Sequence, residues 1–588
     1  MHHNDSNKKK IIFLFFIVTL GFLLFLGASF YWATVDRKLP SLTRKEVNHA
    51  LRGDIVSSDG FRIATSQKLY KVTLDTRNLD PDKKELFINL YSLYSGDNPK
   101  KVLKIINSNF GHVVLSYKID SKKAKYLKEL ARKLFSLRVF VSYENPKTKT
   151  SFLHGMNIIE SGEKRLYPAV DILTPVIGYV RKIEKDGITK VTGVKGLEKY
   201  YEDNLIAIQD SILFGNRDIS GVIIRDRNSR YQQAIDGFNI RLNISLKIQK
   251  IIEKILDRNK DELQAKEIIA GVMDSKNGYV LALASSNRYN PDFIKRKDYA
   301  SLNVTATEYA YEPGSVMKSI TFALLLKENK INPYDLIRIF GGRYKLGKNI
   351  IRDSHKYEWL SAEDIIVHSS NVGIAQIAQN LDNFQFYQGL KDFGFSLRSG
   401  IDLPYEARGE IPPLYKFKSE VYKASVGYGY GMRATFMQIL KAYNVFNNNG
   451  KMLIPKIAKS YFSPETGEVD FEKPPFKQVI PVSVAKRMKK ILIKTVQKGT
   501  GKAAVFEGLE IGGKTGTAKI ASHGGYSKVY NSSFFGFAND KKQRFTIGVL
   551  VREPKKKYYY YASLTAVPVF KEIVDALVEE GLLNPTLY

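Results

Sequence analysis

An uncharged stretch near the start of the chain constrains the fold most strongly. Residues 11–33 carry no charged side chain and are rich in Phe, Leu and Ile. A helix of about 20 apolar residues crosses a bilayer, whereas the apolar part of a cleaved signal peptide, the alternative, is only about 7–15 residues long. The chain has no cysteine, which excludes a lipoprotein anchor, disulfides and thiol chemistry. We therefore expect a single transmembrane helix, retained as a signal anchor, over residues 11–33.

The charges beside this stretch predict its orientation. Lys8, Lys9 and Lys10 stand just before it, and positive residues favour the cytoplasmic side of a membrane. Residues 1–10 are then a short cytoplasmic tail. The rest of the chain is expected outside the inner (cytoplasmic) membrane, in the periplasm or at the cell exterior.

The net charge of +32 would suggest a nucleic-acid partner in a cytosolic protein. Here the cations are scattered along the chain, and no nucleic-acid motif accompanies them. We predict a lysine-rich solvated surface and no nucleic-acid partner. A weak attraction to anionic lipid or to acidic wall polymer is the functional alternative.

Three short motifs in the second half of the chain point to chemistry. They are Ser-Val-Met-Lys at 315–318, Ser-Ser-Asn at 369–371 and Lys-Thr-Gly at 514–516. Together they supply a nucleophile, a neighbouring base, a polar relay and a cationic clamp, which acyl transfer through a serine ester requires. None is specific alone. Further copies of the first two patterns occur at residues 6–9, 161–164, 285–287 and 483–486.

The surroundings of Ser315 distinguish it from the other copies. Pro313 and Gly314 form a turn before it, and the mostly apolar run 316–329 predicts a buried helix after it. Ser315 then lies at a helix start, which favours developing negative charge, with Lys318 one turn later on the same face. Burial and a second cation, for which Lys514 is the candidate, would lower the pKa of Lys318 and make it a base. The ordinary alternative is a capping serine with a solvated lysine.

The second motif is expected at a junction between two helices. Ser361 resembles a capping serine at the start of one helix, and residues 371–380 read as the next helix. Ser369 and Asn371 could there relay a proton and bind a substrate amide, although an ordinary polar turn has the same composition. The copy at 285–287 follows a strand-like run and is better explained as the exit from a strand.

The third motif is expected on a strand of an antiparallel sheet that lines the site. Residues 533–538 and 545–551 are further strand candidates. Lys514, Thr515 and Thr517 could hold a terminal carboxylate, and Gly516 would let an extended peptide approach the backbone. The N–H groups of Thr517 and Ser315 could form an oxyanion hole. As a bare tripeptide, Lys-Thr-Gly is most often a turn.

In this order, and at intervals of 54 and 145 residues, the motifs resemble those of class B penicillin-binding proteins. Further resemblances to that family cover nearly the whole chain, at residues 52–55, 165–168, 193–198, 236–249 and 499–503. Two departures stand out. Ser57-Ser58 replaces a usual Asp-Arg pair, so no charge network is expected at that point, and four tyrosines at 558–561 replace a Tyr-Gly-Gly run at the rim of the site.

The resemblance implies a fold and a domain order. It predicts an α/β (α+β) serine-transpeptidase (penicillin-binding) domain over residues 236–588, with an antiparallel sheet and helices on both faces. A stalk and a mixed α/β pedestal, or dimerisation-like domain, would occupy residues 34–235 between this domain and the anchor. Strand-like residues 70–74 and helical residues 122–134 fall in the pedestal. The bifunctional class A branch is not expected, because no glycan-polymerising motif precedes the pedestal.

The resemblance also implies a reaction, peptidoglycan D,D-transpeptidation. Ser315 would attack the penultimate D-alanine carbonyl of a stem peptide with Lys318 as base. D-alanine would leave through Ser369 and Lys318, and a neighbouring stem peptide's amine would resolve the acyl-enzyme. Asn371 and Lys514 complete the catalytic set, while Thr515, Gly516 and Thr517 bind substrate. β-Lactams would acylate Ser315, and no cofactor or metal is required.

Within class B, the division-type enzymes are more similar than the elongation-type. The second motif ends in Asn371, where elongation enzymes tend to have Asp, and residues 427–431 read Gly-Tyr-Gly-Tyr-Gly. The implied partners are a polytopic membrane glycan polymerase and division proteins. An elongation-type transpeptidase, a membrane-anchored serine β-lactamase and a non-catalytic scaffold remain as alternatives.

Overall fold

The computed structural model describes residues 4–34, 41–185, 187–218, 222–522 and 525–586. The chain divides into two compact units. The first unit combines Met1–Asn48 with Ser211–Ala234, and the second combines His49–Asp210 with Ile235–Tyr588. Both units therefore contain segments that are far apart in the sequence.

The first unit contains the predicted anchor. Helix α1 (Asn4–Thr34) covers residues 11–33, and Lys8–Thr34 is long and apolar enough to cross a membrane. Its large apolar side chains are exposed along the whole helix, which suits a lipid environment. Strands β1 (Thr43–Asn48), β10 (Ser211–Asn216) and β11 (Arg230–Gln232) form an antiparallel sheet in the same unit. The predicted helix is confirmed and fits a single-pass anchor.

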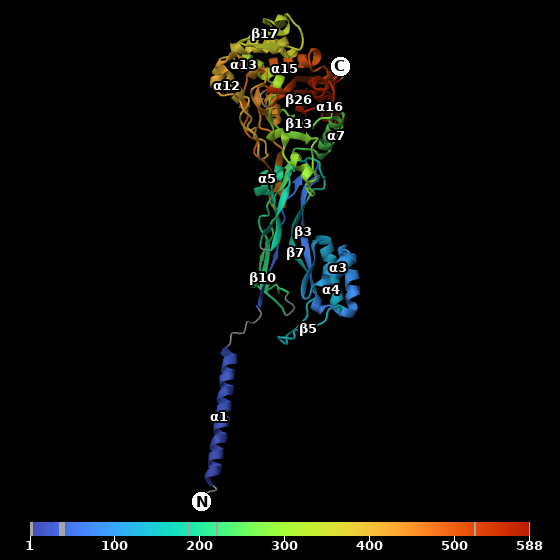
Figure 1. Cartoon of the computed structure of the whole chain (residues 1–588), viewed down its shortest axis with the longest axis vertical. Helices are drawn as coiled ribbons and strands as arrows, with labels where there is room; N and C mark the ends of the chain where they lie inside the picture. Colours follow the sequence, from blue (N-terminus) through green and yellow to red (C-terminus); the bar gives the residue numbers. More distant parts are fainter. Residues whose placement is uncertain (1–3, 35–40, 186, 219–221, 523–524, 587–588) are drawn as a thin grey trace. The chain divides into compact units, whose positions relative to one another are not determined.

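A long sheet forms the pedestal part of the second unit, with strand order β23-β22-β12-β2-β3-β7-β9-β8 and with β4 paired to β3. Figure 1 labels its strands β3 and β7. Its strands are β2 (Ile55–Val56), β3 (Arg62–Asp75), β4 (His112–Asp120), β7 (Met156–Leu166), β8 (Val180–Lys185), β9 (Ile188–Gly193), β12 (Asn239–Leu242), β22 (Ala458–Ser463) and β23 (Gly467–Asp470). The strand predicted at 70–74 lies in β3. Because β12 pairs with both β2 and β22, the sheet joins strands from either side of the predicted boundary at 235/236, and that boundary stays a prediction.

Three helices cover β3, β4 and β7 and close a separate core. They are α2 (Lys84–Ser95), α3 (Pro99–Ser108) and α4 (Ser121–Ser136), and α4 contains the helix predicted at 122–134. Leu74, Phe87, Tyr91 and Leu127 are fully buried between these helices and the sheet. A short hairpin of β5 (Tyr143–Glu144) and β6 (Ser151–Phe152) follows α4.

A buried charge network joins the pedestal motifs that the sequence singled out. Arg52 Nε lies 2.9 Å and Arg165 Nε 2.7 Å from the carboxylate of Glu198, and all three side chains are almost completely buried. Arg165 also donates to the carbonyl oxygen of Gly53. At the departure from the family pattern, the Ser57 hydroxyl accepts the N–H of Phe61. The charges of the network therefore belong to Arg52, Arg165 and Glu198 in the three motifs, and not to residues 57 and 58.

The part of the second unit that carries the three motifs is built on a five-stranded antiparallel sheet. Its order is β14 (Val280–Ser285), β13 (Glu267–Asp274), β27 (Arg544–Arg552), β26 (Gly525–Asn539) and β25 (Glu510–Ser522). The strands predicted at 533–538 and 545–551 lie within β26 and β27. The third motif lies on a strand of this antiparallel sheet, as predicted, and that strand, β25, is at the edge of the sheet.

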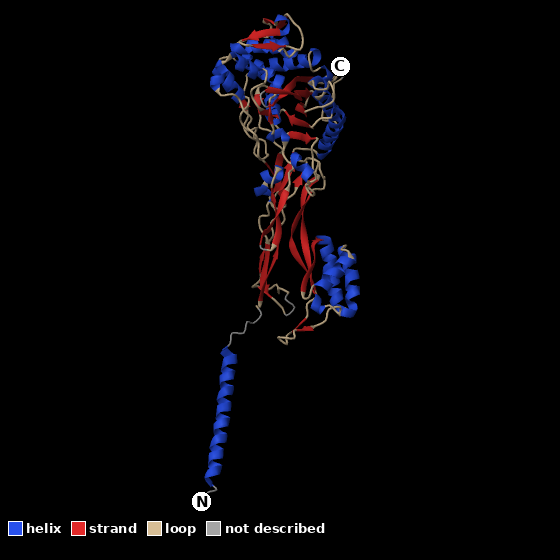
Figure 2. Ribbon diagram, viewed as in Figure 1, coloured by secondary structure: helices blue, strands red, loops and turns tan. Residues whose placement is uncertain are grey.

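Helices pack on both faces of this sheet, and Figure 2 shows them on its two sides. Helices α7 (Leu246–Leu263) and α16 (Ala566–Glu579) cover one face, and α14 (Phe436–Asn447) and α15 (Val482–Lys498) cover the other. Successive residues of a strand point to opposite faces. Phe534 accordingly contacts Phe570 of α16, while Phe535 contacts Phe436 of α14. The predicted fold class is confirmed.

The remaining helices and strands are short. The helices are α5 (Gly196–Tyr200), α6 (Glu202–Leu205), α8 (Thr305–Glu308), α9 (Met317–Lys327), α10 (Ala362–Val367), α11 (Asn371–Ile377), α12 (Asn383–Asp392) and α13 (Glu420–Gly427). The short strands are β15 (Ala310–Tyr311), β16 (Leu336–Arg338), β17 (Arg343–Leu346), β18 (Asn349–Arg352), β19 (Trp359–Ser361), β20 (Ala434–Thr435), β21 (Lys451–Met452) and β24 (Lys477–Gln478).

Candidate active site

Ser315 lies in a 3₁₀ turn, Gly314–Val316, directly before helix α9. Gly314 has a φ of +63°, which a residue with a side chain rarely adopts, and its N–H donates to Gly429 across 3.0 Å. Ser315 itself is half-buried. The predicted place of Ser315 at a helix start is confirmed. The helix ends at Lys327, two residues before the predicted end.

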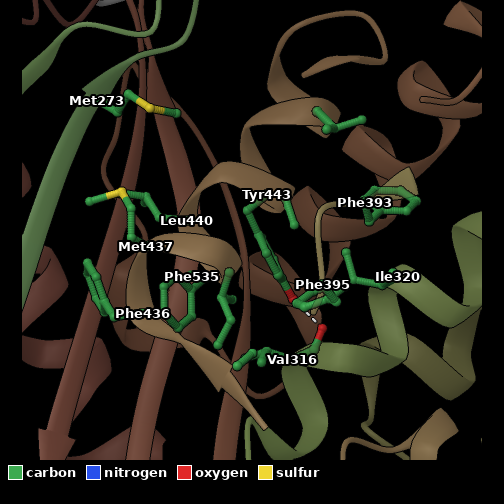
Figure 3. Packing of buried hydrophobic residues seen from close by; sticks show 14 of the residues in the cluster. Met273, Val316, Ile320, Phe393, Phe395, Phe436, Met437, Leu440, Tyr443 and Phe535 are labelled. Carbon is green, nitrogen blue, oxygen red and sulfur yellow. Dashed lines mark hydrogen bonds between the residues drawn. The ribbon is translucent and has the colours of Figure 1, made fainter. Parts of the chain in front are cut away.

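The turn that carries Ser315 is anchored to the hydrophobic core through its next residue, Val316, as Figure 3 shows. The hydroxyl of Tyr443, on α14, donates to the carbonyl oxygen of Val316 over 2.7 Å. The Tyr443 ring packs against Phe535 of β26 with 5.8 Å between centroids. Because protein interiors are close-packed, the two contacts of Tyr443 hold the turn at a fixed distance from the sheet.

Lys318 is fully buried and bonded to the second motif. Its Nζ donates to the carbonyl oxygen of Ser369 (2.6 Å) and to Oδ1 of Asn371 (2.7 Å), and it lies 3.3 Å from Ser369 Oγ. Burial lowers the pKa of Lys318 to about 7, against the opposing effect of the Asp353 charge. Among the hydrogen bonds of the described residues, none joins Lys318 Nζ to Ser315 Oγ, and such contacts often close only when substrate binds.

The second motif lies between α10 and α11, as predicted. Ser361 caps α10 by accepting the Asp364 N–H, and Ser370 caps α11 by accepting the Gly373 N–H. Ser369, between the helices, has a φ of +59°. A serine held in this left-handed region carries backbone strain, which persists where the surrounding structure enforces it. Helix α11 is shorter than predicted and ends at Ile377, followed by a 3₁₀ turn at Ala378–Asn380.

Asp353 is a site residue that the sequence analysis missed. Its carboxylate accepts the Ser370 hydroxyl (2.5 Å) and the N–H groups of Asn371 (2.5 Å) and Val372 (3.0 Å). It therefore binds the start of α11 from outside the helix and orients the second motif. No local pattern marks Asp353, because it lies in irregular chain after β18, far in sequence from the helix that it caps.

Lys514 is fully buried on β25 and bonded to the same serine as Lys318. Its Nζ donates to Ser369 Oγ over 2.8 Å and to the carbonyl oxygen of Thr515 over 3.2 Å. Burial, and then the charge of Lys318, hold the pKa of Lys514 well below its usual value. Burial is therefore the main cause of the lowered pKa at both lysines, as the sequence predicts for Lys318, and Lys514 lies next to it as the expected second cation.

The rest of the third motif lies against the turn that carries Ser315. A Cβ at Gly516 would lie 2.6 Å from Ser533 Oγ and 3.0 Å from the carbonyl oxygen of Pro313. Only glycine fits between these groups without displacement. Thr515 Oγ1 lies 2.7 Å from Thr500 Oγ1, and Thr517 Oγ1 accepts the Ala562 N–H over 3.1 Å.

A cavity of about 600 Å³ gathers these motifs. Five of the predicted residues line it: Ser315, Ser369, Asn371, Thr515 and Thr517. The buried lysines lie behind this wall, bonded to Ser369. The rim is aromatic, since Tyr430, Tyr530, Tyr560 and Tyr561 also line the cavity, and Tyr560 stacks on Tyr530 at 4.6 Å. The tyrosine run at 558–561 thus contributes rings to the rim.

The other copies of the motifs lie elsewhere. Ser161 is inside β7 and Ser483 is inside α15, while Ser285 ends β14 and donates to Glu267. The prediction of a strand exit at 285–287 is confirmed. Within the residues that the structure describes, no group of three or more His, Asp or Glu side chains could hold a metal ion.

Two family models match the chain. Residues 268–575 match the penicillin binding protein transpeptidase domain, and residues 47–242 match the penicillin-binding protein dimerisation domain. The chain belongs to the penicillin-binding protein transpeptidase family. It is a serine-type D,D-transpeptidase, an acyltransferase, of the class B architecture.

Curated relatives match most or nearly all of the chain. Stage V sporulation protein D of Bacillus subtilis is 29% identical over 98% of this chain and 87% of that protein. The probable peptidoglycan D,D-transpeptidase PenA of Neisseria gonorrhoeae is 25% identical over 99% of this chain and 94% of its own. The peptidoglycan D,D-transpeptidase FtsI of Buchnera aphidicola is 28% identical over 74% and 72%.

Solved structures share the fold. Penicillin binding protein 2X of Streptococcus thermophilus superimposes with a TM-score of 0.75 at 20% identity, covering 92% of this chain and 82% of that one. Penicillin binding protein 3 of Mycobacterium tuberculosis, complexed with aztreonam, gives a TM-score of 0.65 at 21% identity, covering 92% and 98%.

Proposed function

We propose that this protein crosslinks peptidoglycan stem peptides through an acyl-enzyme on Ser315 during septal wall synthesis, and that β-lactams inhibit it. One observation carries the proposal. Two buried lysines from different elements, Lys318 and Lys514, bond the single hydroxyl of Ser369 behind a cavity that Ser315 lines. Burying a cation without a carboxylate partner is unfavourable for folding. Proton transfer to and from a serine nucleophile is a function that explains why both lysines are buried here.

In the first half-reaction, Ser315 Oγ attacks the carbonyl carbon of the penultimate D-alanine. The proton of Ser315 passes to the neutral Nζ of Lys318, and the N–H groups of Ser315 and Thr517 bind the oxyanion. The C–N bond then breaks, and the leaving D-alanine takes a proton through Ser369 and Lys318. Lys514, Thr515 and Thr517 hold the terminal carboxylate, while Gly516 keeps the strand close to the turn. This direction of proton transfer is supported by the pKa of about 7 for Lys318.

In the second half-reaction, an amine of a neighbouring stem peptide attacks the ester carbon. Its proton passes to Lys318, the bond to Ser315 Oγ breaks, and Ser315 is regenerated. A β-lactam would enter the same sequence and stop at the ester, because its leaving group stays attached. Solved structures of penicillin binding protein 3 of Mycobacterium tuberculosis, complexed with aztreonam and with ampicillin, support this part of the proposal.

Two observations support the septal role: the relatives that the chain matches, and Asn371 in the second motif. Relatives include proteins named FtsI and PenA, and the second motif ends in Asn where the elongation branch tends to have Asp. Helix α1 would place the catalytic part outside the inner membrane, with a polytopic glycan polymerase and division proteins as partners. Depletion of the protein in its own organism is expected to give long cells without septa. Loss of rod shape with continued septation would favour the elongation-type reading.

The reaction is tested with the full chain in detergent and a synthetic stem peptide ending in D-Ala-D-Ala. We expect release of D-alanine and, with an added amine, a new amide product, both abolished in Ser315→Ala. Ser483→Ala, at a copy of the motif inside α15, is the matched control and should leave both products unchanged. Release of D-alanine by Ser315→Ala would refute the assignment of the nucleophile.

A further inference from the structure

A second cavity of about 550 Å³ adjoins the active-site cavity. It lies among the β17–β18 hairpin, α13 and the hairpin of β25 and β26. Asn371, Tyr430 and Lys519 line both cavities, so the two spaces meet at the second motif. Nothing in the reaction sequence above uses the second cavity.

The second cavity is cationic and has no acid in its lining. Arg352 and Lys519 line it, together with neutral residues only. Both cations are exposed, and among the described residues neither side chain has an ion-pair or hydrogen-bond partner. Glu312 lies outside the lining but contacts the lining residue Tyr526, and it is already engaged, since its Oε1 accepts the Gly431 N–H (2.8 Å) and the Tyr526 hydroxyl (3.2 Å).

The rest of the lining suits an aliphatic chain. Ile350, Ile351 and Val421 supply apolar side chains, and Tyr428 and Tyr430 supply rings whose centroids are 5.9 Å apart. An occupant with a hydrocarbon stem and a carboxylate matches this wall. A bare alkyl ammonium does not, because two unpaired cations would repel it.

Asn371 connects this cavity to the reaction centre. Its Oδ1 accepts Lys318 Nζ over 2.7 Å, and its Nδ2 donates to the carbonyl oxygen of Arg352 over 2.9 Å. One amide side chain therefore touches both the candidate base and the strand that carries Arg352. An amine that passes Asn371 from the second cavity arrives beside Lys318, the group that must take its proton.

We propose that the second cavity binds the acceptor strand, and that the acceptor amine stands next to a carboxylate that Arg352 and Lys519 hold. The inference rests on the proposed transpeptidation. The amine nitrogen bonds to the acyl carbon as the bond from that carbon to Ser315 Oγ breaks. The proton lost by nitrogen passes through Lys318 to Ser315 Oγ. The acceptor class is thus an amino acid that reacts at the amine beside its own carboxylate, and not a plain side-chain alkyl amine.

The test measures partitioning of one acyl-enzyme between two fates. The full chain in detergent receives a thioester acyl donor, with D-alanine, D-alaninamide or n-butylamine as acceptor, and mass spectrometry quantifies amide and hydrolysis products. We expect D-alanine to be preferred over D-alaninamide by about tenfold, as for a charge-assisted contact. The amine of D-alaninamide is less basic than that of D-alanine, so a larger fraction of it is neutral and nucleophilic. Basicity alone would therefore favour D-alaninamide, against the expected preference.

Arg352→Gln is the decisive variant, because Arg352 lines only the second cavity. We expect it to remove most of the preference for D-alanine while acylation by a fluorescent penicillin stays within about twofold of the wild type. Lys519→Gln should also lower the preference. Lys541→Gln, at an exposed lysine in the turn between β26 and β27, is the matched control for lost charge and should change neither rate.

The outcomes separate this inference from the proposed function. Equal use of D-alanine and D-alaninamide by the wild type, or an unchanged preference in Arg352→Gln, would overturn the inference and leave transpeptidation intact. Slower acylation by penicillin in Arg352→Gln with unchanged partitioning would assign the cavity to the donor strand and also overturn it. Failure of the wild type to form any acyl-enzyme would instead refute the proposed function.

Discussion

Two lysines share one hydroxyl at the centre of the candidate site. Lys318 and Lys514 both donate to Ser369 Oγ and both are fully buried. Burial disfavours the charged form of each amine, and the two charges repel each other. Lys318, with a pKa of about 7, is therefore arranged to exchange protons near neutral pH, which an ordinary lysine cannot do.

The protonation state of Lys318 predicts a pH profile. Because the amine must be neutral to accept the Ser315 proton, acylation should be slow below and fast above the pKa of about 7. We expect the acylation rate with a fluorescent penicillin to rise with pH to a plateau, with a midpoint near that value. A profile that keeps rising toward the pKa of a solvated lysine would contradict a buried neutral base.

Asp353 is predicted to be a positioning residue. Asp353→Asn loses the charged acceptor for Ser370 and Asn371, and acylation should slow by about tenfold. The charge of Asp353 also raises the pKa of Lys318, so the midpoint of the pH profile should move to lower pH in this variant. Measuring the rate across pH separates the two effects.

The control for Asp353→Asn is another aspartate at a helix start. Asp382 accepts the Phe384 and Gln385 N–H groups at the start of α12 and does not line the active-site cavity. Asp382→Asn should cost stability without moving the midpoint. An unmoved midpoint in Asp353→Asn would contradict the charge effect on Lys318, and an unchanged plateau rate would contradict the positioning role.

Sequence and structure agree best on single residues that form local patterns. Ser315 and Lys318 are three residues apart and Ser369 and Asn371 two apart, so a short motif could predict each pair. Asp353 and Arg352 act on these motifs through contacts between distant segments. No spacing rule encodes such contacts, which explains why the sequence analysis missed both residues.

Strand β25 is shaped by what lies beneath it. At Gly516 the strand passes so close to the Ser315 turn that a Cβ would lie 3.0 Å from both Pro313 O and Val316 Cγ1. The third motif therefore combines a lysine, a threonine hydroxyl and a glycine. The missing side chain of Gly516 lets the edge strand lie close to the turn that carries Ser315.

Gly516→Ala is predicted to separate this strand from the turn. A shift of even about 1 Å in a reacting group can cost a hundredfold, so penicillin acylation should fall by at least about tenfold while circular dichroism stays unchanged. Gly525→Ala is the control, since its Cβ would meet nothing within 4 Å. Normal acylation in Gly516→Ala would contradict the close approach.

Elements with strong local patterns were predictable, and their ends were less so. The apolar run after Ser315 predicted α9, and alternating and apolar runs predicted β26 and β27. The 3₁₀ turns at Gly314–Val316 and Ala378–Asn380 were missed, because a change in helix type at an end reflects packing and not composition. The strand order of the sheets also depends on long-range pairing, such as β12 with β2.

At the scale of the whole molecule, the buried ion pairs of Glu198 with Arg52 and Arg165 stabilise the pedestal. Burial would raise the pKa of Glu198, but Arg165 and Arg52 hold it below its usual value. Glu198→Gln would leave Arg165 without its anionic partner and Arg52 with Glu202 alone, and breaking a buried ion pair typically costs about 3–5 kcal/mol. We expect a clear fall in the urea midpoint. Glu358→Gln, which breaks an exposed pair with Arg338, should cost under about 1 kcal/mol, and equal effects would contradict a structural network.

The anchor predicts how the chain partitions. A version starting at Ser41 keeps β1 and lacks α1, so it should move from the membrane fraction to the soluble fraction. Because the chain has no cysteine, the shortened chain needs no disulfide to fold and should still react with penicillin. Ultracentrifugation followed by penicillin labelling measures both properties, and continued sedimentation with membranes would show that α1 is not the main attachment.

The central claim is that Ser315 is acylated and that the ester persists. The most direct measurement is intact mass of the detergent-solubilised chain and its Ser315→Ala variant over hours after a pulse of penicillin. The account predicts one stable adduct on the wild type, mapped to the peptide with Ser315, and none on the variant. An adduct on both proteins, or one on the wild type that clears within seconds, would contradict it.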